Sequence, residues 1–171
     1  MTAWRQENKV RGVRASKVTG LALLGLFCAA VTWAAPAEAA STERIVTDHR
    51  TGLAIAGFDP VAYFIQSRPV AGKADFEAHQ GGAIWRFHDA RDREIFLSAP
   101  EVYAPRFGGY DPTGLARGRI IAGEPNIWLI HGGRLYLFSR IENRDAFAAN
   151  PAAFAEAAEK WPALSETLAD Y

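Results

Sequence analysis

The sequence predicts an exported α+β domain, in which two hairpin–helix units pack around one core and form a small antiparallel sheet. Three observations predict this fold class. A basic N-terminus precedes an apolar segment, aromatic strand-like runs alternate with charged or Ala-rich helical runs, and residues 81–103 recur in altered form as residues 132–154. A length of 171 residues is typical of one domain once a processed segment is removed.

The first 39 residues have the three parts of a signal peptide. Five basic residues precede the apolar run 18–34, and the small residues of 35–39 follow it. We expect cleavage after Ala39, or after Ala37 as the second choice. The apolar run is shorter than the roughly 20 residues of a spanning helix, so we expect no stable membrane anchor after cleavage. The predicted location is periplasmic or secreted.

Cleavage changes the charge and removes the only cysteine, Cys28. Five of 19 basic and two of 19 acidic residues leave, so 14 basic and 17 acidic residues remain, a net charge of −3. A mildly acidic domain is not typical of nucleic-acid binding, and no nucleic-acid partner is expected. Without cysteine, the mature chain has no disulfide, thiolate metal site or thiol nucleophile.

Residues 40–52 are polar and predict a flexible lead-in to a domain spanning 53–162. Residues 53–64 have strand-like content broken at Gly57 and Asp59-Pro60, and we expect them to join the sheet. A loop follows, with a short helix possible at 74–79. Residues 83–89 predict a strand, and 90–98 predict a helix that Asp89 caps and Pro100 ends.

The second half repeats this order. Residues 104–126 are rich in Gly and Pro and predict an ordered loop with a short strand at 119–122. Residues 127–139 predict a hairpin that turns at 131–133. Ser139 and Glu142 match a capping box, and an Ala-rich helical segment follows, interrupted at Pro151 and Pro162. Residues 163–171 predict a helical tail.

The repeat has a constant offset of 51 residues between 81–103 and 132–154. Six positions are identical: Gly81/Gly132, Gly82/Gly133, Phe87/Phe138, Arg93/Arg144, Phe96/Phe147 and Pro100/Pro151. A hairpin with one helix buries too little apolar surface to be stable alone, so we expect the two copies to share a core. The aromatic residues at strand positions are expected to be buried there: Trp85, Phe87, Trp128, Tyr136, Phe138 and Trp161.

This strand–helix unit resembles the YHS domain family. The family unit reads roughly YxFCSxxCKxxFxxxPxxY, and residues 85–103, WRFHDARDREIFLSAPEVY, keep its aromatic residues, the basic Arg93, Pro100 and Tyr103. The segments GFDPVAYF (57–64) and YAPRFGGY (103–110) are similar to the exported bacterial branch, and the likeness covers most of 53–162. The resemblance implies a compact α+β fold and, for some members, transition-metal binding by cysteines.

The positions of the family cysteines hold other residues here. His88 and Asp92 stand at the two positions in the first copy, and Ser139 and Asn143 in the second. Many members of the exported branch read GGYCAY where this chain reads GGYDPT, which places Asp111 at a third cysteine position. The resemblance therefore directs attention to His88, Asp92 and Asp111.

These three residues are the candidate metal ligands, since imidazole and carboxylate together bind copper, zinc or iron. Further donors would come from His49, His79 or His131. The alternative is that Asp89 or Asp92 serves the helix N-terminus and that His88 simply ends a strand. Asp59, Tyr63 and Tyr110 are candidate pocket residues, with a turn and core packing as their alternative roles.

Two functional hypotheses follow. The first is a non-catalytic binding module for a transition-metal ion or a metal-bearing small molecule. The second is a structural or protein-interaction domain with a degenerate metal site, whose partner is another extracytoplasmic protein. An uncharacterised hydrolase-like enzyme is third, because the common catalytic motifs are absent from the sequence. If His88, Asp92 and Asp111 meet at one point the binding module is favoured, and if each serves its own cap or turn the interaction domain is favoured.

Overall fold

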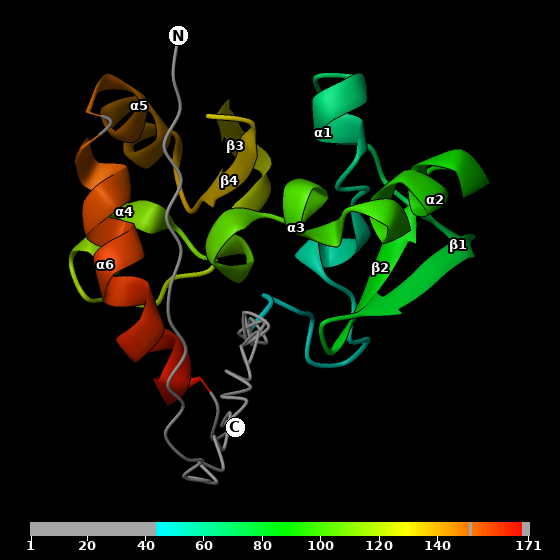
Figure 1. Cartoon of the computed structure of the whole chain (residues 1–171), viewed down its shortest axis with the longest axis horizontal. Coiled ribbons are helices and arrows are strands. Elements are labelled where there is room, and N and C mark those ends of the chain that lie inside the picture. Colours follow the sequence, from blue (N-terminus) through cyan, green and yellow to red (C-terminus); the bar gives the residue numbers. More distant parts are fainter. Residues whose placement is uncertain (1–43, 151, 169–171) are drawn as a thin grey trace, which may run out of the picture. The chain divides into compact units, whose positions relative to one another are not determined.

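The computed structural model describes residues 44–150 and 152–168, all within the compact unit Ala40–Tyr171. The predicted signal peptide and cleavage site, residues 40–43 of the lead-in, Pro151 and the last three residues lie outside this part. The α+β fold class is confirmed, with helices and two small antiparallel sheets (Figure 1).

The first half of the fold contains one hairpin. Its elements are the 3-10 turn η1 (Ile55–Gly57), α1 (Ala62–Ile65), β1 (Lys73–Gln80), β2 (Ala83–Phe87), α2 (Ala90–Ser98) and α3 (Pro100–Tyr103). The second half has the 3-10 turn η2 (Arg106–Gly109), α4 (Pro112–Ala116), β3 (Glu124–His131), β4 (Arg134–Phe138), α5 (Ile141–Ala149) and α6 (Ala152–Thr167). The two halves thus present a similar order of elements.

Each hairpin turns at a pair of glycines with positive φ, at 61° and 79° in Gly81-Gly82 and at 57° and 71° in Gly132-Gly133. This conformation suits two-residue hairpin turns. Both hairpins also shift register at the same place, between Lys73 and Glu77 in β1 and between Glu124 and Trp128 in β3. The predicted second hairpin is confirmed, whereas the short helix at 74–79 was wrong: these residues lie in β1, where pairing with β2 outweighs local helix propensity.

Residues 53–64 do not form the expected strand. Ile55, Ala56 and Gly57 have φ values of 42°, 53° and 76°, so the chain makes a left-handed turn there, and α1 begins soon after Pro60. The segment pairs with the first sheet only through a single parallel bridge between Leu53 and Ile84. The apolar residues of this segment were interpreted as a strand, but they enter the core from a turn and a helix.

Residues 104–126 are more helical than expected. The segment contains η2 and α4, and the predicted strand at 119–122 is reduced to one bridge between Tyr110 and Ala122. The same bridge occurs in the first half between Phe58 and Ala71. Asp59 N–H donates to Val70 O, as Asp111 N–H donates to Ile121 O, both at 2.8 Å.

The structural repeat is therefore longer than 81–103 and 132–154. It begins at the left-handed turns η1 and η2 and extends through α2 and α5. Gly72 and Gly123 lie at equivalent places, and a Cβ on either would approach backbone of the facing strand to 2.5 Å at Arg86 or 2.7 Å at Leu137. These glycines let the chain cross closely over β2 and β4.

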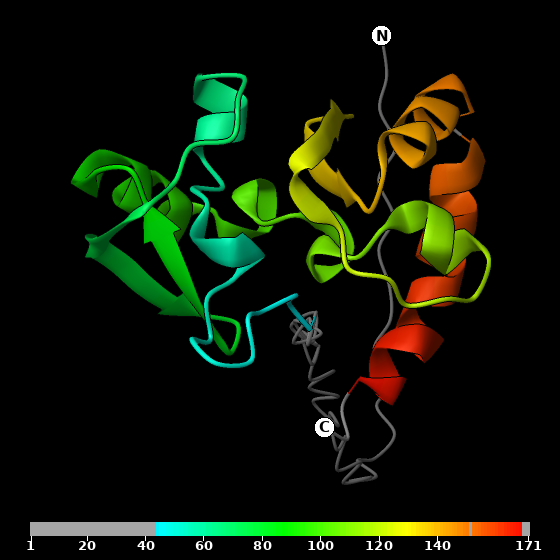
Figure 2. The same ribbon diagram turned by 180° about the vertical axis from the view of Figure 1, so that it is seen from behind.

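The buried apolar residues form two clusters, not the single core that we predicted. Strand β4 contributes to both, because successive side chains of a strand point to opposite faces. Leu135 and Leu137 join the first-half cluster, while Tyr136 and Phe138 join the second. The β3–β4 hairpin accordingly lies between the first-half elements and the pair α5 and α6 (Figure 1; Figure 2 gives the reverse view). The aromatic residues predicted for the core belong to these two clusters.

The lead-in is hydrogen bonded to the rest of the fold at Val46 and Asp48. Val46 N–H donates to Gly108 O at 2.7 Å, and Val46 O accepts from Ile55 N–H at 3.2 Å. Residues 44–46, which we call the strap, thus connect η1 with η2. After the strap in the sequence, Asp48 Oδ1 accepts hydrogen bonds from Arg50 N–H, Thr51 N–H and Thr51 Oγ1, and these bonds close a turn.

Helix α6 runs through Pro162, so the predicted break at this residue was wrong. Residues 163–167 are helical as predicted, but they continue α6. A proline inside a helix costs about 3 kcal/mol. Trp161 on one side of Pro162 and Leu164 and Leu168 on the other pack against the second cluster, and this burial offsets the cost. None of the helices that the structure describes is long and apolar enough to cross a membrane.

Candidate functional site

The carboxylate of Asp111 is fully buried and ties three segments of the second half together. Oδ1 accepts from Thr113 N–H at 2.8 Å, which fixes the start of α4. Oδ2 accepts from Ser139 N–H at 2.9 Å, from Ser139 Oγ at 2.6 Å and from Asn143 Nδ2 at 2.6 Å. One side chain therefore joins α4, the end of β4 and the first turn of α5.

Burial of Asp111 opposes its charged form, but the hydrogen bonds from Ser139, Asn143 and Thr113 outweigh burial. Together they hold the pKa of Asp111 below its usual value. The residue is thus a carboxylate at neutral pH, with its charge distributed over hydrogen bonds that the fold supplies. We call a buried carboxylate that hydrogen bonds to several segments of the fold, as Asp111 does, a tie.

The predicted capping box at Ser139 was wrong. Arg140 occupies the N-cap position of α5 and makes no side-chain capping bond, since the Ser139 hydroxyl donates to Asp111 instead. A charged acceptor makes the stronger hydrogen bond. The S-x-x-E pattern describes only local partners, whereas Asp111 is 28 residues away in sequence.

Asp59 is the first-half counterpart of Asp111 and is also fully buried. Oδ1 accepts from Val61 N–H at 2.8 Å, and Oδ2 accepts from His88 N–H at 2.7 Å. His88 stands where Ser139 stands in the second half, so the backbone part of the tie is the same in both halves. The predicted turn at Asp59-Pro60 is confirmed by the bond to Val61.

Asp92 stands where Asn143 stands, and its side chain hydrogen bonds with Asp59. Burial, that hydrogen bond and the charge of Asp59 raise the pKa of Asp92 to about 6. The two ties thus differ at two side chains: Asn143 and the Ser139 hydroxyl in the second half correspond to Asp92 and the His88 imidazole in the first.

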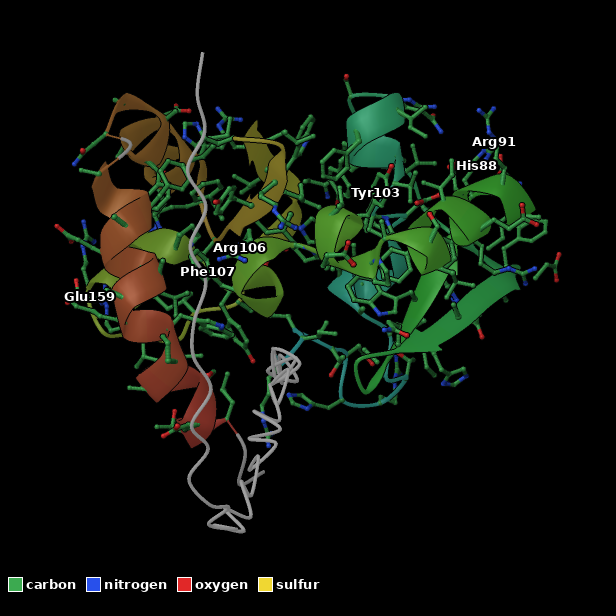
Figure 3. The ribbon with its side chains drawn as sticks, viewed as in Figure 1. His88, Arg91, Tyr103, Arg106, Phe107 and Glu159 are labelled. Atoms are coloured by element: carbon green, nitrogen blue, oxygen red, sulfur yellow. The ribbon has the colours of Figure 1, made fainter. Side chains whose placement is uncertain are left out.

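His88 lies at the start of α2, near Arg91 (Figure 3). Its side chain is 40 % exposed, and Nδ1 lies 3.6 Å from Asp89 Oδ2. Nδ1 makes no hydrogen bond within the described part of the chain. Asp89 caps α2 by accepting from Asp92 N–H at 2.9 Å, as predicted, and this bond is the main cause that lowers the pKa of Asp89.

The structure does not bring the three candidate metal ligands together. Asp111 is held by second-half donors, while His88 and Asp92 belong to the first half. Among residues 44–150 and 152–168, no group of three or more His, Cys, Asp or Glu side chains is arranged to hold a metal ion. The further donors are also dispersed, and the His131 ring stacks on Phe154 at a centroid distance of 4.5 Å.

In comparisons with known proteins, no family model, curated sequence or solved structure matched this chain.

Of the candidate pocket residues Asp59, Tyr63 and Tyr110, the two tyrosines pack in different clusters. Tyr63 is fully buried, its hydroxyl donates to Pro125 O at 2.9 Å, and its ring meets Trp128 edge-on at 5.3 Å. Burial, and then the charge of Asp59, raises the pKa of Tyr63. Tyr110 packs at 5.8 Å from Trp161 in the second cluster. The core and turn roles hold for these residues.

Tyr63→Phe is expected to lower the free energy of unfolding by about 1 kcal/mol, because Pro125 O loses its buried donor while the ring stays packed. Urea denaturation followed by tryptophan fluorescence measures this loss. Tyr103→Phe is the control, since the Tyr103 ring packs on Phe64 at 5.2 Å and its hydroxyl has no hydrogen bond with the described residues. Equal effects of the two substitutions would contradict the assignment of the Tyr63 bond.

Sequence reasoning missed Asn143 and Ser139 as partners of Asp111. The available signal was the pattern Gly-aromatic-Asp-Pro, which occurs at 57–60 and again at 109–112. Its offset is 52, whereas the hairpins repeat at 51, so a search at constant offset stops short of it. With this pattern added, Asp59 and Asp111 are recognised as equivalent positions.

Proposed function

We propose that this chain is an exported, non-catalytic structural or protein-interaction domain of YHS type. In this proposal the positions where relatives keep cysteines serve as internal ties of the fold. The observation that carries the proposal is the set of hydrogen bonds on Asp111, whose two oxygens already accept from Thr113, Ser139 and Asn143. A carboxylate so fully used has little capacity left for a metal ion.

The geometry supports this second hypothesis over the metal-binding module. Asp111 is held by donors of the second half, whereas His88 N–H and Asp92 meet Asp59 in the first, so the three candidate ligands lie apart, as expected of an interaction domain. We therefore assign none of them as a metal ligand. The partner would be another extracytoplasmic protein.

The burial of the acidic groups supports a non-catalytic role. Asp59 and Asp111 have no exposed surface and Asp92 is 5 % exposed, so a dissolved substrate does not reach them. His88 has an accessible side chain, yet a general base needs an orienting partner at hydrogen-bond distance. The 3.6 Å separation of Nδ1 from Asp89 is longer than that.

Metal analysis tests the proposal. The protein is expressed from the full 171-residue sequence, purified from the compartment in which it accumulates and analysed for copper, zinc and iron. We expect less than a stoichiometric amount of any metal and no rise in melting temperature when these ions are added. Stoichiometric metal that is lost in a His88→Ala variant would contradict the proposal and restore the binding module.

A further inference from the structure

The two halves of the fold differ at a buried polar position that faces the Asp tie. In the second half, Asn143 Nδ2 donates to Asp111 Oδ2 at 2.6 Å. In the first half, Asp92 occupies the same place on the helix and hydrogen bonds with Asp59. An amide always has a proton to donate, whereas a carboxyl group donates only when it is protonated.

The surroundings make a second negative charge costly. Asp59 has no exposed surface, and Asp92 is 5 % exposed. Asp59 is committed as an acceptor, because it receives the N–H groups of Val61 and His88. Two buried carboxyl groups in contact are stable when they share one proton.

We propose that the Asp59–Asp92 pair is a pH-sensitive latch: one proton on Asp92 holds the first turn of α2 to the turn at Asp59, and its loss toward neutral pH loosens that contact. Asn143 makes the same contact in the second half without a titrating proton. The first half is therefore the half that responds to pH. The latch goes beyond the proposed function and does not depend on it.

The charged groups around Asp92 modulate the latch. Asp59 and Asp89 favour the protonated form and His88 favours the ionised form. Strand β1, which packs against α2, carries Lys73, Asp75, Glu77 and His79, and none of these is among the main causes that shift the pKa of Asp92. Glu77 is instead paired with Arg86 at 2.8 Å.

The sign of the effect follows from the pKa of Asp92, which is about 6 in the folded protein and lower in the unfolded chain. The folded state therefore binds the proton more tightly. The stabilisation is fully present below about pH 4 and is lost as the pH rises through about 6. Across this range, the folding equilibrium constant is expected to fall by a factor on the order of one hundred.

Urea denaturation of the full-sequence protein between pH 4.5 and 8 tests the latch, with two substitutions at equivalent positions. D92N replaces the titrating carboxyl group by an amide, which donates a hydrogen bond at every pH. We expect the free energy of unfolding of this variant to fall less than that of wild type between pH 5 and 7.5. At pH 7.5 we expect the variant to be more stable than wild type. N143D introduces a carboxyl group beside Asp111. We expect it to add a second fall in stability over the same pH range.

Hydrogen exchange provides the local readout. After correction for intrinsic exchange rates, protection of the His88 and Val61 amides is expected to drop between pH 5 and 7.5 in wild type and to stay constant in D92N. A D92N variant with the wild-type pH dependence would overturn the proposal. If D92N does not fold, an N143D variant whose stability has the same pH dependence as wild type would overturn it equally.

Discussion

Gly108→Ala is expected to lower the free energy of unfolding by about 3 kcal/mol. A Cβ at this position would come within 1.7 Å of Arg44 O, so the strap must move away from η2. The displacement breaks the bonds of Val46 N–H to Gly108 O and of Ile55 N–H to Val46 O, each worth about 1 kcal/mol. The φ of 62° adds roughly 1 kcal/mol of backbone strain for any residue with a side chain.

Gly118→Ala separates these contributions. Gly118 has a similar φ of 70°, but a Cβ there has no atom within 4 Å. The control therefore carries the backbone strain alone, about 1 kcal/mol. Chemical denaturation of both variants measures the difference, which is the contribution of the strap. If both lose the same amount of stability, the strap does not bind η2 as described.

Asp111→Ala is expected to be the most destabilising substitution of a polar residue, with a loss of about 3–5 kcal/mol. The substitution removes the only acceptor that the structure describes for Thr113 N–H and Ser139 N–H. It also removes the nearer acceptor of Asn143 Nδ2, which keeps only its longer bond to Ser139 Oγ at 3.2 Å. These donors are in or beside the second cluster, where water replaces the lost acceptor poorly. Calorimetric or urea unfolding gives the size of the effect.

Asp48→Ala is the matched control for the buried tie. Asp48 Oδ1 accepts from Arg50 N–H, Thr51 N–H and Thr51 Oγ1, but this turn is exposed to solvent. Water satisfies the freed donors there, so the expected loss is at most about 1 kcal/mol. A loss at Asp48 equal to that at Asp111 would mean that burial does not determine the strength of these ties.

The elements that local sequence determines were predicted well. Paired glycines located the turn of the second hairpin, and Asp89 located the start of α2, because each acts on backbone within a few residues. The strand β1 was missed, since its sequence KADFEAHQ alternates weakly and its conformation comes from pairing with β2. The left-handed conformations of Ile55, Ala56 and Phe107 were missed as well, because these residue types seldom adopt positive φ.

The candidate site depended on long-range partners, and there the sequence was less informative. Asp59 was predicted as a pocket residue and Asp111 as a metal ligand, but the partners that join them to the following helix lie about 30 residues away. The resemblance to a cysteine-bearing family grouped His88, Asp92 and Asp111 by analogy, whereas the fold groups Asp59 with Asp92 and Asp111 with Asn143. Ser139 illustrates the general reason: a local cap and a distant carboxylate compete for one hydroxyl, and only the fold decides.

The central claim is that Asp111 and the Asp59–Asp92 pair are equivalent buried ties, one charged and one holding a proton. Titration of the aspartate side-chain carboxyl carbons by NMR tests it most directly. The account predicts that Asp111 titrates below its usual range and that Asp92 titrates near pH 6. If both residues titrate together near pH 4, as solvent-exposed aspartates do, the claim is contradicted.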